Sequence, residues 1–318
     1  GFIMKAIQIS EFGEPDVLRY IDVPIPEIAP DQVLVRVNCA GVNPIDYKTR
    51  KGLGFVANYL RDKLPWIPGF DFAGEIVRVG SQVSAFAVDD AVLGFANFPQ
   101  GGGAYAEYLA VGTAQIVKKP ASVSFATAGA LPVAGLTAYQ ALFDVAALSP
   151  GQRVLILAGA GGVGHLAIQL AKLHGAQVAA TASQGKLVFL SELGADLALD
   201  YTNTTALQSA GLFDVIIDNM GGSIGLAALA YLAAKGTLVT IPTVTAAEII
   251  QQANQLGKKA LGLTVRFDAG QLTELVRKIA TGEMRLHIDK SYLLREAGLA
   301  HHDIEQGRTT GKRVLLAN

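Results

Sequence analysis

The chain has 318 residues, a single cysteine and a formal net charge of −1, and 51% of its residues are hydrophobic. This length predicts about two domains, and the near-neutral charge argues against nucleic acid or an anionic membrane surface as a partner, because both select basic patches. The lone Cys39 excludes an intrachain disulfide framework, and the longest uncharged stretch, 120–143, is interrupted by Pro, Gly and polar residues. We therefore expect a soluble, cytoplasmic protein without a membrane span.

The first part of the chain predicts short strands separated by Pro and Gly residues. The expected strands cover residues 5–9, 17–23, 32–40, 74–79, 105–111 and 115–118. Such a pattern is typical of a β-rich, barrel-like domain.

From residue 123 onward, apolar strands alternate with helical segments. The expected strands cover residues 154–158, 177–182, 197–200, 214–219, 236–242 and 260–265. This alternation predicts a doubly wound parallel sheet, so the fold class is α/β. The remaining elements, helices 269–280 and 294–306 and strand 313–316, are expected to fold back onto the first domain. The predicted domains are therefore 1–122 with 266–318, and 123–265.

A glycine-rich turn follows the first strand of the parallel sheet. Gly159, Gly161 and Gly164 form a GxGxxG pattern between an apolar run and a helical segment, with Gly162 and Val163 inside the pattern. A strand, a glycine turn and a helix N-terminus together can bind a pyrophosphate through backbone N–H groups. The pattern predicts dinucleotide binding at these five residues, and the alternative is a tight turn with a purely structural role.

The residues after the second strand of this sheet discriminate between dinucleotides. NAD-binding sites carry an Asp or Glu there, but this strand ends at Ala182 without a carboxylate and is followed by Ser183 and Lys186. A hydroxyl and a cation suit a 2′-phosphate, so the sequence favours NADPH. The alternative is that Ser183 caps the next helix and Lys186 is solvated in its first turn.

Four separated motifs resemble one enzyme family. They are 40–46 (AGVNPID), 68–80 (PGFDFAGEIVRVG), 103–108 (GAYAEY) and 158–164 (AGAGGVG). In this order they resemble the zinc-independent, zeta-crystallin-like quinone oxidoreductase branch of the medium-chain dehydrogenase/reductase superfamily. The resemblance implies a GroES-like catalytic domain, an NADPH-binding Rossmann domain, a cleft between the two, and a homodimer.

The residue types at the family's metal positions argue against zinc. Zinc-dependent relatives carry a Cys in the segment matching 41–46 and a His-Glu pair in the segment matching 69–74, where this chain has Asn43, Phe70 and Asp71. Phe is no ligand and Asn is a poor zinc ligand. The histidines offer no replacement, because three are scattered and two are expected on a surface helix: His165, His174, His287, His301 and His302. We expect no bound metal.

Without a metal, hydrogen-bond donors must stabilise the charge that hydride transfer places on the substrate oxygen. Quinones and α,β-unsaturated carbonyl compounds suit such a site, because conjugation spreads the charge. The sequence leaves open whether a quinone or an enone is reduced. It also leaves open a non-catalytic, NADPH-binding role like that of the family's lens crystallins.

The resemblance also implies site residues. It places Asn43, Asp46 and Tyr47 on a catalytic loop beside the nicotinamide, with Asn43 as a hydrogen-bond donor and Tyr47 as a proton donor. It implies further cofactor contacts at Thr137, Tyr201, Asn219, Ile241 and Thr243. The alternatives are structural: Asp46 as a helix cap, Tyr47 as a packed side chain, and Thr137 bonded within its own helix.

Overall fold

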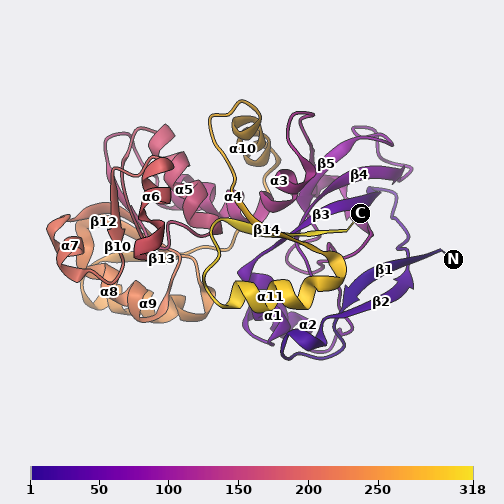
Figure 1. Cartoon of the computed structure of the whole chain (residues 1–318), viewed down its shortest axis with the longest axis horizontal. Coiled ribbons are helices and arrows are strands. Elements are labelled where there is room, and N and C mark those ends of the chain that lie inside the picture. The colour runs from indigo at the N-terminus through magenta and orange to yellow at the C-terminus, as the bar shows by residue number, and fades with distance from the viewer. Residues whose placement is uncertain (1, 318) are drawn as a thin grey trace. The chain divides into compact units, whose positions relative to one another are not determined.

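The computed structural model describes residues 2–317, which form two units (Figure 1). The first unit contains the chain up to Leu136 and from Arg266 onward, and the second contains Thr137–Val265. The sequence predicts the first boundary at 122/123, earlier than the structure has it. The difference arises because helix α3 (Phe125–Ala130) packs on strands of the first unit.

The first unit is built on a seven-stranded sheet of order β14-β15-β3-β4-β5-β7, with β6 paired to β3. Its neighbours are antiparallel except for β14 and β15, which are parallel. Its strands are β3 (Gln32–Val42), β4 (Asp71–Val79), β5 (Ala91–Phe95), β6 (Tyr108–Gly112), β7 (Ile116–Lys118), β14 (Ile288–Leu293) and β15 (Lys312–Leu316). A separate two-stranded antiparallel sheet joins β1 (Ile3–Gln8) and β2 (Arg19–Pro24).

Helices connect and cover this sheet. Besides α3 they are α1 (Pro44–Arg50), α2 (Gly54–Leu60), α4 (Pro132–Tyr139, which crosses the unit boundary), α10 (Ala269–Ala280) and α11 (Ala297–Glu305). Figure 1 shows α11 beside α1, although the two are far apart in sequence, and the two helices are in contact. The C-terminal segment therefore reaches the loop that follows β3.

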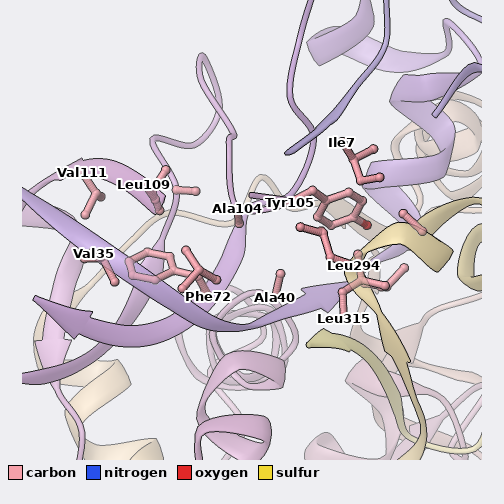
Figure 2. Packing of buried hydrophobic residues seen from close by; sticks show 14 of the residues in the cluster. Ile7, Val35, Ala40, Phe72, Ala104, Tyr105, Leu109, Val111, Leu294 and Leu315 are labelled. Atoms are coloured by element: carbon pink, nitrogen blue, oxygen red, sulfur yellow. The ribbon is translucent and has the colours of Figure 1, made fainter. Parts of the chain in front are cut away.

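The core of the first unit collects apolar side chains from distant parts of the chain (Figure 2). Alternate residues of β3, such as Val35 and Val37, are fully buried, as expected for a strand with one face in the core. Tyr105 joins the same cluster as Ile7 and Leu294 and is itself fully buried. Its hydroxyl group is thereby carried into the interior.

The second unit is a six-stranded parallel sheet of order β10-β9-β8-β11-β12-β13. Its strands are β8 (Arg153–Ile156), β9 (Gln177–Ala182), β10 (Leu197–Asp200), β11 (Phe213–Asp218), β12 (Leu232–Thr240) and β13 (Lys259–Gly262). Its helices are α5 (Gly162–Leu173), α6 (Leu187–Glu192), α7 (Thr204–Ser209), α8 (Gly222–Ala228) and α9 (Thr243–Gln255). The chain order reverses between β8 and β11, which is where ligands bind in sheets of this type.

Both predicted architectures are present, the β-rich unit and the parallel-sheet unit. Two strands were not predicted, and each has a physical reason. In β5 the apolar pattern is interrupted by Gly94. A glycine is required there, because a Cβ would collide with the carbonyl oxygen of Gln115. Strand β14 is mostly exposed and polar, so it lacks a hydrophobic alternation. No helix within residues 2–317 has the length and apolar character that crossing a membrane requires.

Candidate active site and cofactor-binding residues

The glycines of the turn after β8 have two different roles. A Cβ on Gly159 would lie 2.9 Å from the Cβ of Ala180, and a Cβ on Gly164 would collide with the carbonyl oxygen of Ala158. These two glycines therefore permit close packing of α5 on the sheet. A Cβ on Gly161 would come no closer than 3.4 Å to the protein, again at Ala158. The space around Gly161 is open to a ligand.

Helix α5 begins at this turn and offers unshared backbone donors. Its first residues, Gly162 and Val163, are partly exposed, and the first helical bond runs from the N–H of His165 to the carbonyl of Gly161. The preceding N–H groups have no acceptor within the helix, and the helix dipole favours an anion there. The buried His165 places Nδ1 2.9 Å from the carbonyl oxygen of Gly161 and 2.7 Å from that of Gly162, which ties the turn to the helix. This turn fits a pyrophosphate.

The ends of β9 and β10 lie next to each other and expose two polar side chains. Ser183 follows β9, is exposed and makes no side-chain capping bond, although it precedes a 3₁₀ turn that ends at Lys186. Tyr201 follows β10, is exposed, and donates its backbone N–H to the carbonyl of Ala182 at 3.2 Å. The nearest strand-end carboxylate, Asp200, accepts hydrogen bonds from its own turn instead. This corner fits a phosphate.

Asp218 connects the carboxyl ends of β11 and β12. Its Oδ1 accepts the backbone N–H groups of Met220 at 2.9 Å and Gly221 at 2.8 Å, and its Oδ2 accepts the hydroxyl of Thr240 at 2.8 Å. The backbone N–H of Ile241 bonds to the carbonyl of Asp218 at 2.9 Å. Asp218 is fully buried, so it shapes this edge of the sheet and does not face a ligand.

The other predicted cofactor residues lie in different settings. Asn219 donates from Nδ2 to the carbonyl of Leu157 at 2.9 Å, and its Oδ1 is buried without a hydrogen-bond partner among the described residues. Thr243 is exposed at the first residue of α9. Thr137 is 5% exposed within α4. Asn219 thus links the ends of β8 and β11 beside the glycine turn.

In the first unit, Asn43 lies at the end of β3 inside a buried polar cluster. Its Nδ2 donates to Asp71 Oδ2 at 2.9 Å, and its Oδ1 accepts from Lys312 Nζ at 2.5 Å. All three side chains are at most 3% exposed. The neighbouring Phe70 packs against the ring of Phe98, with 5.1 Å between centroids. The two polar residues at the family's metal positions are therefore bonded to each other.

Asp46 lies in the first turn of α1 and has two roles. Its Oδ2 accepts the backbone N–H of Asn43 at 2.8 Å, so the predicted alternative of a helix cap is observed, and it also accepts the hydroxyl of Tyr105 at 3.3 Å. Its Oδ1 is buried without a partner among the described residues. Burial raises the pKa of Asp46 to about 7 and that of Asp71 to about 6.

His301 extends this cluster and corrects a prediction. It was expected on the surface, but it is fully buried in α11, while its neighbour His302 is exposed. Arg50 Nη1 lies 3.0 Å from His301 Nδ1, and Tyr105 Oη lies 3.0 Å from His301 Nε2. Because a guanidinium only donates, Nδ1 must accept and Nε2 carries the proton. The hydrogen bonds then run in one direction, from Arg50 through His301 and Tyr105 to Asp46.

The buried histidine makes the folded state sensitive to acid. Burial, and secondarily the charge of Arg50, lower the pKa of His301 from 6.5 to about 3. As the pH falls from about 6.5 towards 3, the unfolded chain binds a proton that the folded chain does not. The contribution of His301 to the free energy of unfolding should therefore fall, by up to about 1.4 kcal/mol per pH unit.

We expect His301→Gln to remove this contribution, since Gln can accept from Arg50 and donate to Tyr105 without titrating. Urea unfolding between pH 4 and 8 gives the free energy of unfolding of both proteins, and the wild-type value minus the variant value measures the contribution of His301. This difference should decrease below about pH 6.5. The raised pKa values of Asp46 and Asp71 act in the opposite direction in both proteins and cancel. A pH-independent difference would contradict the prediction.

Tyr47 follows Asp46 in helix α1 and lies on the more exposed side of that helix. It is partly buried, its ring lies 5.9 Å from Lys51 Nζ, and burial raises the pKa of its hydroxyl. The hydroxyl therefore keeps its proton at neutral pH.

Between residues 2 and 317, no group of three or more His, Cys, Asp or Glu side chains is placed to hold a metal ion.

Family models match both units. Residues 29–121 match the alcohol dehydrogenase GroES-like domain, and residues 193–315 match the zinc-binding dehydrogenase domain. Together with the solved structure described next, these matches confirm the predicted fold class of a GroES-like domain and a Rossmann domain.

Two of the three relatives described here cover nearly the whole chain. The 2-methylene-furan-3-one reductase of Solanum lycopersicum is 37% identical over 98% of this chain and 79% of its own. The chloroplastic NADPH-dependent alkenal/one oxidoreductase of Arabidopsis thaliana is 42% identical over 69% of this chain and 58% of its own. The solved quinone oxidoreductase from Coxiella burnetii is 42% identical, with a TM-score of 0.97 and 100% of both chains covered. The chain therefore belongs to the medium-chain dehydrogenase/reductase superfamily, in its quinone oxidoreductase branch.

Proposed function

We propose that this protein is an NADPH-dependent reductase of quinones or of the activated C=C bond of α,β-unsaturated carbonyl compounds. The observation that carries the proposal is the buried cluster around Asn43, which presents hydrogen-bond donors where zinc-dependent relatives carry metal ligands. The names of the tomato, Arabidopsis and Coxiella relatives, all reductases or oxidoreductases of such compounds, support it.

The second unit supplies the residues that would hold NADPH. Backbone N–H groups of Gly162, Val163 and Gly164 would bind the pyrophosphate, because the turn is open at Gly161 and leads into a helix N-terminus. The N–H of Gly161 itself donates to the carbonyl of Ala158 at 3.1 Å, so Gly161 would contribute the space for the ligand. The 2′-phosphate would lie among Ser183, Lys186 and Tyr201. The remaining contacts proposed are the strand-end and helix residues Thr137, Asn219, Ile241 and Thr243. NADPH, when bound, supplies a hydride.

We expect Lys186→Ala to weaken NADPH binding by about 1.5–3 kcal/mol, the range of a charge-assisted hydrogen bond to a phosphate. NADH affinity should hardly change, because NADH lacks the 2′-phosphate. Titration calorimetry with both cofactors measures this, and Lys172→Ala, which removes a cation paired with Asp196 on the same unit, is the matched control. An equal loss for both cofactors would give Lys186 a structural role.

The first unit supplies the residues that would stabilise the substrate. Hydride addition to a conjugated acceptor places negative charge on the carbonyl oxygen, and the reaction is completed by one proton. Asn43 Nδ2 carries two hydrogens, of which one bonds to Asp71. The second would donate to the substrate oxygen, and the protonated hydroxyl of Tyr47 would supply the proton. Conjugation spreads the charge, so a quinone or enone needs less help from these two neutral donors than an unactivated aldehyde, which would benefit from a Lewis acid.

A steady-state assay tests the function. Purified protein with NADPH is offered 9,10-phenanthrenequinone, 1,4-benzoquinone, 2-hexenal and an aryl vinyl ketone. Product NMR then distinguishes a hydroquinone from a saturated carbonyl compound. We expect turnover of at least one substrate, and its product identifies the substrate class. Tight NADPH binding without turnover of any of them would favour the alternative, a non-catalytic NADPH-binding protein.

A further inference from the structure

We propose that Lys312 is a positioning residue of the active site, whose ammonium group fixes the Asn43 carboxamide with one Nδ2 hydrogen directed to Asp71 and the other available to substrate. The inference rests on the proposed function of Asn43 as a donor to the substrate oxygen. The four sequence motifs do not include Lys312, and the proposal gives its buried ammonium group a role in the active site.

Lys312 reaches the end of β3 because β15 pairs with that strand. Lys312 is the first residue of β15, and the next residue, Arg313, is in register with Val42. Lys312 Nζ donates to the carbonyl oxygen of Val42 at 2.9 Å and to Asn43 Oδ1 at 2.5 Å. The ammonium group therefore holds both the last strand residue and the first loop side chain.

A buried ammonium group needs an explanation, because removing it from water costs several kcal/mol and an apolar residue would avoid that cost. Lys312 is 3% exposed, and burial lowers its pKa, while the carboxylates of Asp71 and Asp46 oppose that shift. These carboxylates explain why a cation is tolerated. They do not explain why its hydrogen bonds go to the oxygens of Val42 and Asn43.

The chemistry of the two neighbours gives the Asn43 amide one orientation. An ammonium group can only donate, so it must face Oδ1, and an ionised Asp71 can only accept, so it must face Nδ2. Asp71 is itself fixed by the backbone N–H of Val133 at 2.7 Å. Donation to Oδ1 also draws electron density from Nδ2, which strengthens the remaining N–H as a donor. Lys312 thus both orients and polarises the group that would meet the substrate oxygen.

Three variants separate positioning from charge balance. Lys312→Arg keeps a buried cationic donor and should retain most of the activity. Lys312→Met removes the donor and should lower kcat on the order of tenfold, with NADPH affinity unchanged because that site lies in the other unit. The double variant Lys312→Met/Asp71→Asn restores the charge balance. In it, the carboxamide at position 71 can donate to Asn43 Oδ1, which reverses the Asn43 amide.

We expect the double variant to regain thermal stability relative to Lys312→Met but not to regain kcat. A purely structural charge pair predicts that both return together, and that result would overturn the proposal. Should Lys312→Met fail to fold, the kcat of the double variant, compared with that of the wild type, still distinguishes positioning from charge balance. Wild-type kcat in Lys312→Met would overturn the proposal as well.

A second readout does not depend on activity. The side-chain ¹⁵N–¹H signals of Asn43, assigned by their loss in Asn43→Ala, should shift little in Lys312→Arg and strongly in the double variant. Unchanged signals in the double variant would show that Lys312 does not orient the amide. If the wild-type protein reduces no quinone or enone, the proposed function fails, and these signals alone decide whether Lys312 holds Asn43.

Discussion

Replacing Gly161 by Val is expected to abolish NADPH binding while the chain stays folded. The backbone of Gly161 is extended, with φ −79° and ψ −179°, which Val adopts without strain. A Cβ there lies 3.4 Å from the nearest protein atom, so the added methyl groups enter the open space before α5. That space is where the backbone would approach a pyrophosphate. The loss of a glycine N-cap should cost only about 1 kcal/mol of stability.

The matched control is Gly164→Ala, one helical turn away. Its Cβ would collide with the carbonyl oxygen of Ala158, so we expect a large loss of thermal stability whether or not NADPH is added. Circular dichroism with thermal unfolding, together with calorimetric titration of NADPH, distinguishes the two variants. Undiminished NADPH affinity in Gly161→Val would show that the motif is only a structural turn, the alternative that the sequence left open.

The features that could be predicted from the sequence are local ones. The parallel strands and the glycine turn were predictable, because apolar runs, glycine spacing and the missing carboxylate after Ala182 are read within a few residues of each other. Strands β9 and β10 even match residue for residue. The mostly polar edge strand β14 has no such local signal.

The polar cluster around Asn43 could not be predicted, because long-range pairing creates it. Asn43 and Lys312 are 269 positions apart, and Arg50 and His301 are 251 apart. A lysine before an apolar strand and two adjacent histidines on a helix are patterns typical of exposed residues. Burial follows here from the pairing of β15 with β3 and from the packing of α11 on α1. Only the tertiary structure turns these residues into partners of the segment that follows β3.

The same cluster changes how the donor residues must be tested. Asn43→Ala removes the proposed donor to substrate and also deprives Lys312 and Asp71 of a partner, so part of its effect will be lost stability. Tyr47→Phe is the cleaner variant, because it removes one hydroxyl from a partly buried ring. Its matched control is Tyr59→Phe in α2, which removes a hydroxyl from an exposed tyrosine of the same unit.

We expect Asn43→Ala and Tyr47→Phe each to lower kcat on the order of tenfold to a thousandfold, since each removes a donor that acts as charge develops on the substrate oxygen. NADPH affinity should stay near the wild-type value in both, and Tyr59→Phe should turn over normally. Stopped-flow measurement of NADPH oxidation, run well below the unfolding temperature of each variant, separates lost chemistry from lost folded protein. Wild-type rates in both variants would mean that these side chains only shape the pocket. The developing charge would then be stabilised by backbone N–H groups, the cofactor ribose or solvent.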